Sequence, residues 1–278
     1  MAHLPQRAPA GLAGVVTGMA GYDERASAAP VVRRETPTGG CTLILAWGDP
    51  LRVEGPAGPL WQRAFLAGLD DGWARTAFTG HQRGVQVDLT PLGAARLLGR
   101  DGVELARHAP PLDDLGVPAL TALPDRLAET ATWDARFARV AATLRDLLAD
   151  NRFDPDPEVA HAWSRLHAAR GRVPVGHLAA ETGWSRRHLL TRFHRQVGLA
   201  PTVTGRVLRF RHATELLAPG TGPARVPTDR RITDVAAAAG YADHSHLVRE
   251  FRDLAGCTPG EFLREWFPDV QDAGAPGS

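Results

Sequence analysis

The sequence contains no lysine and only two cysteines. All 32 basic residues of the 278-residue chain are arginine. Without lysine, a phosphate-binding loop of the Walker A type is excluded. Cys41 and Cys257 lie far apart and neither belongs to a CxxC pair. The sequence therefore supports neither a disulfide framework nor a thiolate zinc site.

Long apolar runs and nucleophile motifs are also missing. No stretch approaches the roughly 18 apolar residues that a bilayer span needs. The N-terminal residues lack the charged start and compact apolar run of a leader peptide, so we expect a cytoplasmic protein. A GxSxG nucleophile elbow is absent as well.

What the chain does have is an uneven charge distribution. Residues 1–157 carry 16 arginines against 19 acidic residues, whereas residues 158–268 carry 16 against 10. The most basic stretch, 171–213, has eight arginines and a single acid, Glu181. Such a stretch suits a polyanion, but the solvated face of an ordinary helical bundle has the same composition.

Local patterns predict an α+β domain over residues 21–150. Short apolar runs such as "CTLILAW", separated by glycine and proline, predict strands between 31 and 89. Helical periodicity follows from Pro91 and again over 133–150. The stretch "NRFDPDPE", 151–158, predicts a linker, because its X-Pro steps end one helix and begin the next. The flanking segments 1–20 and 269–278, rich in alanine, glycine and proline, are expected to be mobile tails.

After the linker, the pattern changes to an all-α domain of about seven helices over 159–268. The first helix is expected to be capped by Asp156 and to end at Gly171, and 218–229 is expected to be a loop. The other six are predicted, from their caps and periodicity, over roughly 174–182, 185–197, 201–217, 233–239, 243–255 and 258–267.

Two segments of this domain repeat each other. "LAAETGWSRRHLLTRFHRQVGLAP" begins at Leu178, and "VAAAAGYADHSHLVREFRDLAGCTP" begins at Val235. Leu189, Phe193 and Gly198 recur as Leu247, Phe251 and Gly256, 58 residues later. Each copy has a short alanine-rich helix, a turn with glycine and an aromatic residue, and a longer capped helix, which is the layout of a helix-turn-helix unit.

Each longer helix has an apolar face and a polar face. At 100° per residue, Leu189 and Phe193 face inward together, as do Leu247 and Phe251. A DNA major groove admits one such helix, and arginine can bond guanine or neutralise phosphate. The helix N-termini, predicted to be capped by Ser185 and Asp243, also direct N–H groups toward a phosphate chain. The outward residues are Arg187, Thr191 and His194 in the first copy, flanked by Leu190 and Arg195, and Ser245, Arg249 and Arg252 in the second.

The repeat resembles the DNA-binding domain of AraC/XylS-type transcription regulators. The resemblance covers about 110 residues and is most specific in "ITDVAAAAGYADHSHLVREFRDLAGCTPGEFLREW". It implies duplex DNA and RNA polymerase as partners, and it is compatible with a small-molecule effector and a homodimer. Together with the helix faces, it assigns base reading to Arg187, Leu190, Thr191, His244, Ser245 and Arg249, and phosphate contacts to Ser185, Arg186, Arg195 and Arg252.

Two departures from the family pattern concern the second unit. The loop before Ile232 is longer than usual, and residues 214–268 carry six arginines against eight acids. In the first domain, "HQRGVQVDLTPLGAARLLG" followed by "PLDDL" resembles the effector-side domain of one branch of the family. It lacks a cupin-type HxH, Glu and His signature, so neither metal nor cofactor is predicted.

Other interpretations remain open at this point. An enzyme would need a catalytic pocket within 31–115, and a protein-interaction module would keep the repeat without binding DNA. His244 and His246 point to different helix faces, which disfavours a shared metal. The remaining conspicuous side chains are assigned to turn packing (Trp184, Tyr241), to the surface (His161, His167), or to either the core or a pocket (Trp47, Trp61, Trp73).

Overall fold

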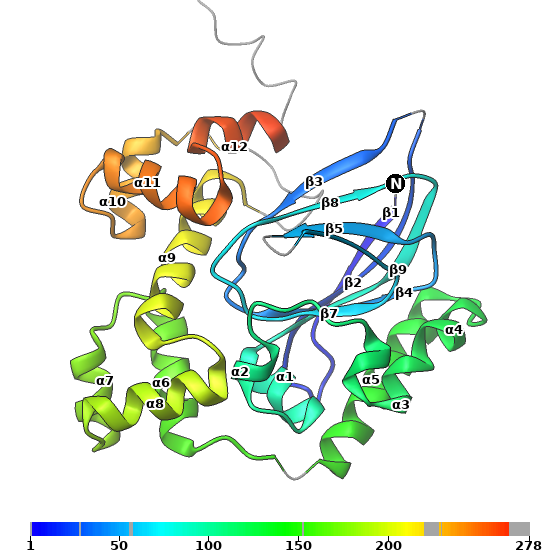
Figure 1. The fold of residues 1–278 in the computed structure, drawn as a ribbon, viewed down its shortest axis with the longest axis horizontal. Helices are drawn as coiled ribbons and strands as arrows, with labels where there is room; N and C mark the ends of the chain where they lie inside the picture. Colours follow the sequence, from blue (N-terminus) through cyan, green and yellow to red (C-terminus); the bar gives the residue numbers. More distant parts are fainter. Residues whose placement is uncertain are drawn as a thin grey trace, which may run out of the picture.

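The computed structural model describes residues 2–27, 29–55, 58–151, 153–219, 228 and 230–266. Within these residues, nine strands and their flanking helices form the first part of the chain, and a helical domain forms the second (Figure 1). This arrangement confirms the predicted order of an α+β domain followed by an all-α domain.

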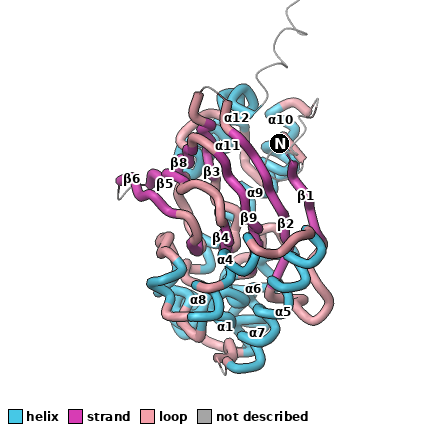
Figure 2. Tube along the Cα trace, turned by 90° about the vertical axis from the view of Figure 1, so that its right-hand side faces the viewer, coloured by secondary structure: helices cyan, strands magenta, loops and turns pink. Residues whose placement is uncertain are grey.

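The strands form two antiparallel sheets. The first has the order β1-β2-β9-β4-β7 and the second β3-β8-β5-β6. Figure 2 shows the strands β1, β2 and β9 side by side. The bounds are β1 (Ala2–Gln6), β2 (Val16–Arg25), β3 (Val31–Glu35), β4 (Cys41–Ala46), β5 (Leu51–Gly55), β6 (Gly58–Gln62), β7 (Phe65–Ala67), β8 (Ala74–Phe78) and β9 (His81–Leu89).

The prediction of a mobile tail over residues 1–20 is wrong. Residues 2–6 pair with β2, and β2 in turn pairs with β9 from Val16↔Leu89 to Arg25↔His81. Leu12 and Val15, between the two strands, are fully or almost fully buried. The composition of residues 1–20 does not predict this order, because the segment pairs with β2, and β2 is held by β9, a strand more than 60 residues away. The tail predicted over 269–278 lies outside the described residues.

Helices cover one face of the first sheet. The two helices predicted in this region are present, and Thr90 caps the first of them by accepting a hydrogen bond from the backbone N–H of Gly93 at 2.9 Å. Val85 and Val87 of β9 share a core with Val140 and Leu144 of the longest helix. The bounds are α1 (Pro91–Leu98), α2 (Gly102–Leu105), the 3-10 turn η1 (Leu112–Leu115), α3 (Pro118–Thr121), α4 (Leu123–Ala128) and α5 (Trp133–Asp150).

The described part of the second domain contains the seven predicted helices. Their starts and ends agree with the predictions to within one to three residues, because caps and periodicity are local signals. Of the loop predicted over 218–229, only residues 218, 219 and 228 are described. The bounds are α6 (Pro157–Ala168), α7 (Val175–Thr182), α8 (Arg186–Val197), α9 (Pro201–Leu217), α10 (Ile232–Ala239), α11 (His244–Ala255) and α12 (Pro259–Trp266).

The two helix-turn-helix units differ in how they are buried. Leu178, Leu189 and Phe193 of the first unit belong to one apolar cluster with the first domain. The second unit has a separate cluster, which includes Phe210, Leu247 and Phe251. The first unit is therefore continuous with the first domain (residues 2–150, called the β domain below) through apolar packing, whereas the second has a core of its own.

Candidate nucleic-acid interface

The inner faces of α8 and α11 are completely buried. Leu189 and Phe193 of α8 and the equivalent Leu247 and Phe251 of α11 have no exposed surface. The Phe251 ring also packs edge-on against that of Phe210, with 4.8 Å between the ring centroids. Packing on this side fixes the rotation of each helix, so the opposite faces are presented to solvent.

Both predicted N-caps are present. The Ser185 hydroxyl accepts a hydrogen bond from the backbone N–H of His188 at 3.2 Å, and the Asp243 carboxylate accepts one from His246 at 2.7 Å. The turn before each helix is filled by an aromatic residue, as predicted: Trp184 packs against His188, and Tyr241 packs against His246. Each cap satisfies one of the N–H groups that the first turn leaves without a partner inside the helix.

The predicted base-reading residues lie on the exposed faces of α8 and α11. On α8, Arg187 and Thr191 are exposed, as is Leu190 with 37% of its surface accessible. On α11, His244, Ser245 and Arg249 are exposed. These three residues line a surface hollow of about 340 Å³ together with Arg252 and Val248.

Val248 also lines this hollow, and the sequence analysis does not predict it as a contact residue. It lies four residues after His244, on the same side of α11. Helical periodicity alone places Val248 beside Ser245 and Arg249, and this is the signal that identifies it in the sequence. Its side chain is half-buried and is the only apolar one among the residues that line the hollow.

Ion pairs separate the arginines of the second domain into two groups. Among the described residues, five of them have carboxylate partners: Arg165 with Glu181, Arg192 with Asp156, Arg195 with Asp101, Arg206 with Glu250 and Asp253, and Arg211 with Glu215. Within the described residues, Arg186 and Arg187 of α8 and Arg249 and Arg252 of α11 have none. The uncompensated positive charge of the two longer helices therefore lies on their exposed faces.

Two of these ion pairs differ from the sequence predictions. Asp156 does not cap α6 with its side chain; its carboxylate accepts hydrogen bonds from Arg192 at 2.6 and 2.7 Å. Arg195, a predicted phosphate contact, donates instead to Asp101 of the first domain at 2.5 Å. Asp101 is 94 residues distant in sequence, and nothing local to α8 indicates that pairing.

Most acidic residues of the second unit form ion pairs or hydrogen bonds with other groups of the protein. Glu250 and Asp253 pair with Arg206, and Glu265 pairs with Arg34 of β3. Glu261 accepts a hydrogen bond from the backbone N–H of Thr258 at 2.7 Å. The exposed face of α11 is therefore not acidic, although the unit as a whole has more acidic residues than arginines.

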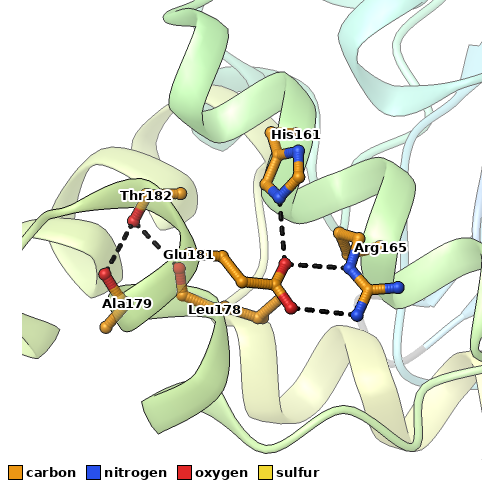
Figure 3. A network of polar contacts seen from close by, with 6 residues as sticks. All are labelled: His161, Arg165, Leu178, Ala179, Glu181 and Thr182. Atoms are coloured by element: carbon orange, nitrogen blue, oxygen red, sulfur yellow. Dashed lines mark hydrogen bonds and ion pairs between the residues drawn. The ribbon is translucent and has the colours of Figure 1, made fainter.

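The single acid of the basic stretch is also neutralised. Glu181 of α7 accepts two hydrogen bonds from Arg165 of α6, at 2.8 and 2.9 Å, and one from His161 at 2.9 Å (Figure 3). Hydrogen bonds from Arg165 and then His161 lower the pKa of Glu181 to about 2. His161 is exposed, as predicted, yet it helps to fasten the first helix of the unit to α6.

The three tryptophans considered for a pocket have different environments. Trp61 is 65% exposed. Trp47 packs against Trp133 and the guanidinium of Arg136. Trp73 lines a hollow of about 410 Å³ between the β domain and α11, opposite Asp253.

The described part of the chain has neither a metal-binding cluster nor a membrane-spanning helix. There, no group of three or more His, Cys, Asp or Glu side chains is arranged to hold a metal ion. Over the same residues, every helix is too short or too polar to cross a membrane.

Comparison with known proteins agrees with the geometry of the repeat. A family profile described as a helix-turn-helix domain matches residues 178–265. No curated protein matches the chain. Solved structures that are similar to the chain include ToxT, the C-terminal domain of AraT, and CuxR.

The first of these structures is ToxT from Vibrio cholerae, with 10% identity and a TM-score of 0.49 over 88% of this chain and 97% of that one. The C-terminal domain of AraT, a response regulator from Geobacillus stearothermophilus, has 18% identity and a TM-score of 0.35 over 41% and 88%. The AraC-like transcriptional activator CuxR has 17% identity and a TM-score of 0.27 over 75% and 86%. From the family match and the two capped units that it spans, residues 178–265 are a helix-turn-helix domain of the AraC type.

Proposed function

We propose that this protein is a transcription regulator that reads one asymmetric duplex site with both helix-turn-helix units. The observation that carries the proposal is the distribution of unpaired arginines. Arg187 of α8 and Arg249 of α11 are exposed, lack carboxylate partners among the described residues, and stand on the outward faces of equivalent helices. The two helices would enter successive major-groove segments, roughly 34 Å apart.

The outward residues of α8 and α11 are proposed to fall into two groups, one that contacts bases and one that contacts phosphates. Arg187, Leu190 and Thr191 of α8, and His244, Ser245 and Arg249 of α11, are proposed to contact base edges. Arg186 and Arg252, also unpaired, are proposed to contact phosphates. The N–H groups of the first turn after Ser185 would add a further phosphate contact. Arg195 would have to exchange Asp101 for phosphate, so its share of the binding energy is expected to be the smallest.

Val248 extends the proposed reading surface of α11. Base edges in the major groove differ in their donors and acceptors, and thymine additionally presents a methyl group. A half-buried valine beside Ser245 and Arg249 suits that methyl group by apolar contact. We therefore include a thymine within the half-site read by α11.

The β domain is proposed to be the regulatory part of the molecule. DNA binding would place the protein beside a promoter, where contact with RNA polymerase activates transcription or occlusion represses it. A small-molecule effector bound by the β domain would act by favouring one arrangement of the two domains over another.

Selection from a random duplex pool tests this function. The full chain is expected to enrich two short sequence blocks separated by about one helical turn, with affinity falling steeply as salt rises. A matched control for the arginines is Arg139→Ala, an exposed position on α5. Failure to enrich any sequence at low salt would contradict the proposal.

A further inference from the structure

The glycines that follow α8 and α11 are equivalent in the repeat, and both lie against the first domain. At Gly198, a Cβ atom would come within 2.7 Å of the Gly102 carbonyl oxygen and 2.8 Å of the Ala106 Cβ. At Gly256, a Cβ atom would overlap the indole of Trp73. Both glycines have positive φ, 104° and 65°, as a helix C-cap requires. In both units the β domain thus approaches the C-terminal end of the longer helix.

A polar contact between the two domains lies near each of these glycines. At the end of α8, Arg195 donates to Asp101 at 2.5 Å. At the end of α11, Arg34 donates to the carbonyl oxygen of Ala255 at 2.7 Å and to Glu265 of α12 at 2.8 Å. The Arg34 guanidinium also lies 4.8 Å from the centroid of the Trp73 ring. We call these two sets of interactions the C-terminal contacts.

Arg34 is well suited to hold the end of a helix that belongs to another domain. The last carbonyl groups of an α-helix have no partner within the helix and carry partial negative charge. A buried guanidinium satisfies one of them and compensates that charge. Arg34 is 8% exposed, so water screens the interaction little.

The two helices depend on these contacts to different degrees. The first unit shares an apolar cluster with the β domain, so α8 is held by packing as well. The second unit has a separate core. The second domain also contacts the β domain at α9, where Arg211 donates to the Thr38 carbonyl oxygen and Leu208 lies against Gly39. In Figure 1, β3 lies beside α11 and α12, whereas α1 and α2 lie beside α8.

We propose that the β domain sets the placement of α11 relative to α8 through the C-terminal contacts, with Arg34 as the positioning residue for the second unit. The inference rests on the proposed function, because the placement of the two helices determines which half-site spacing is read. Neither set of contacts uses the outward residues Arg187, Ser245 or Arg249, so the reading faces stay accessible. Release of Arg34 frees the second unit to move about α9.

The test compares Arg34→Ala with Arg33→Ala in the full chain. Arg33 is the neighbouring arginine of β3, and its partner Glu24 lies within the first domain. Binding is measured on the selected duplex and on duplexes with one or two base pairs added to or removed from the spacer. For the wild type and Arg33→Ala we expect a loss of about tenfold or more per added base pair, and for Arg34→Ala a nearly flat profile. Affinity for an isolated α11 half-site should be the same in all three proteins.

A second measurement does not involve DNA. Amide hydrogen exchange in the last turn of α11 and in α12 should be faster in Arg34→Ala than in the wild type or Arg33→Ala. Trp73→Ala should reproduce both effects from the other side of the contact, without changing any residue of the second domain. Arg34→Lys should restore part of the spacing preference, because it keeps the charge but not the full set of hydrogen bonds.

The outcomes separate this inference from the proposed function. If Arg34→Ala and Trp73→Ala bind DNA with an unchanged spacing preference, α9 alone sets the spacing and the inference is wrong. Unchanged exchange in α11 and α12 would overturn it equally. If the wild type selects no duplex, the proposed function fails, and faster exchange in Arg34→Ala would still show that Arg34 holds the second unit.

Discussion

Arg206 of α9 places its Nε 2.8 and 3.0 Å from the two carboxylate oxygens of Glu250 on α11. Glu250 is buried, and Arg206 also donates to Asp253, one turn further along α11, at 2.6 Å. This interaction fastens the second recognition helix to the helix that connects the two units. It faces away from the outward residues of α11, which leaves those side chains available to a ligand.

Arg206→Ala is expected to destabilise the second unit by about 2–4 kcal/mol, because it leaves the Glu250 carboxylate buried without its partner. Urea denaturation followed by tryptophan fluorescence and circular dichroism measures the change. Arg52→Ala is the control: its pair with Glu54 lies at the surface with both side chains partly exposed and should contribute less than about 1 kcal/mol. Equal effects of the two substitutions would contradict the structural role of Arg206.

Gly171→Ala is expected to destabilise the first unit more than Gly183→Ala. Both glycines have positive φ, 73° and 70°, so alanine is strained at either position by about 1 kcal/mol. At Gly171, a Cβ atom would also overlap the backbone of Gly205 in α9, whereas at Gly183 nothing lies within 4 Å. We expect an additional cost of about 1–3 kcal/mol at Gly171, measured by thermal and urea denaturation. Similar stabilities of the two variants would mean that the α6–α7 turn does not pack closely against α9.

Arg187→Ala and Arg249→Ala should each weaken binding to the selected duplex by about 1–3 kcal/mol and relax specificity at a local base pair. Arg186→Ala and Arg252→Ala should instead weaken binding to all duplexes and lower the salt slope by about one. Titrations on the selected site, its single-base variants and an unrelated duplex separate the two patterns. A loss at all sequences for Arg187 or Arg249 would reassign that residue to phosphate.

Val248→Ala should abolish a preference for thymine over uracil at one position of the α11 half-site. The two bases differ only in the methyl group that an apolar side chain contacts in the major groove. Replacing each thymidine of the half-site in turn by deoxyuridine identifies the position in the wild type. If no replacement affects the wild type, Val248 does not contact thymine.

The free energy of unfolding should fall at acid pH because Glu181 becomes protonated. Its pKa is about 2 in the folded protein, below the ordinary value of 4.5, because it accepts hydrogen bonds from Arg165 and His161. A lowered pKa means that the unfolded chain binds the proton more readily. The stabilisation is therefore complete above about pH 4.5 and is lost as the pH falls toward 2.

Denaturation at a series of pH values measures this effect as a slope. Glu181→Gln should flatten the slope between pH 4.5 and 2. Glu129→Gln, an exposed carboxyl without an ion pair among the described residues, should leave it unchanged. An identical slope in the wild type and Glu181→Gln would show that the network of Figure 3 does not persist in solution.

The helical domain was predictable because its signals are local. Ser185 and Asp243 each supply a cap to the N–H three residues later, and Gly198 and Gly256 each supply the left-handed residue that ends a helix. The 58-residue repeat then identifies which faces of α8 and α11 are equivalent. These features follow from residues within one or two helical turns of one another.

The sequence by itself therefore determined the helices, their caps, the repeat and the outward positions of both recognition helices. Only the tertiary structure decided which arginines remain unpaired, since the partners of Arg195 and Arg34 are 94 and 231 residues away. It also ordered residues 2–25, because the pairing of β2 with β9 cannot be recognised from the composition of either segment. Contacts of this kind depend on how distant elements pack, and no local pattern specifies that packing.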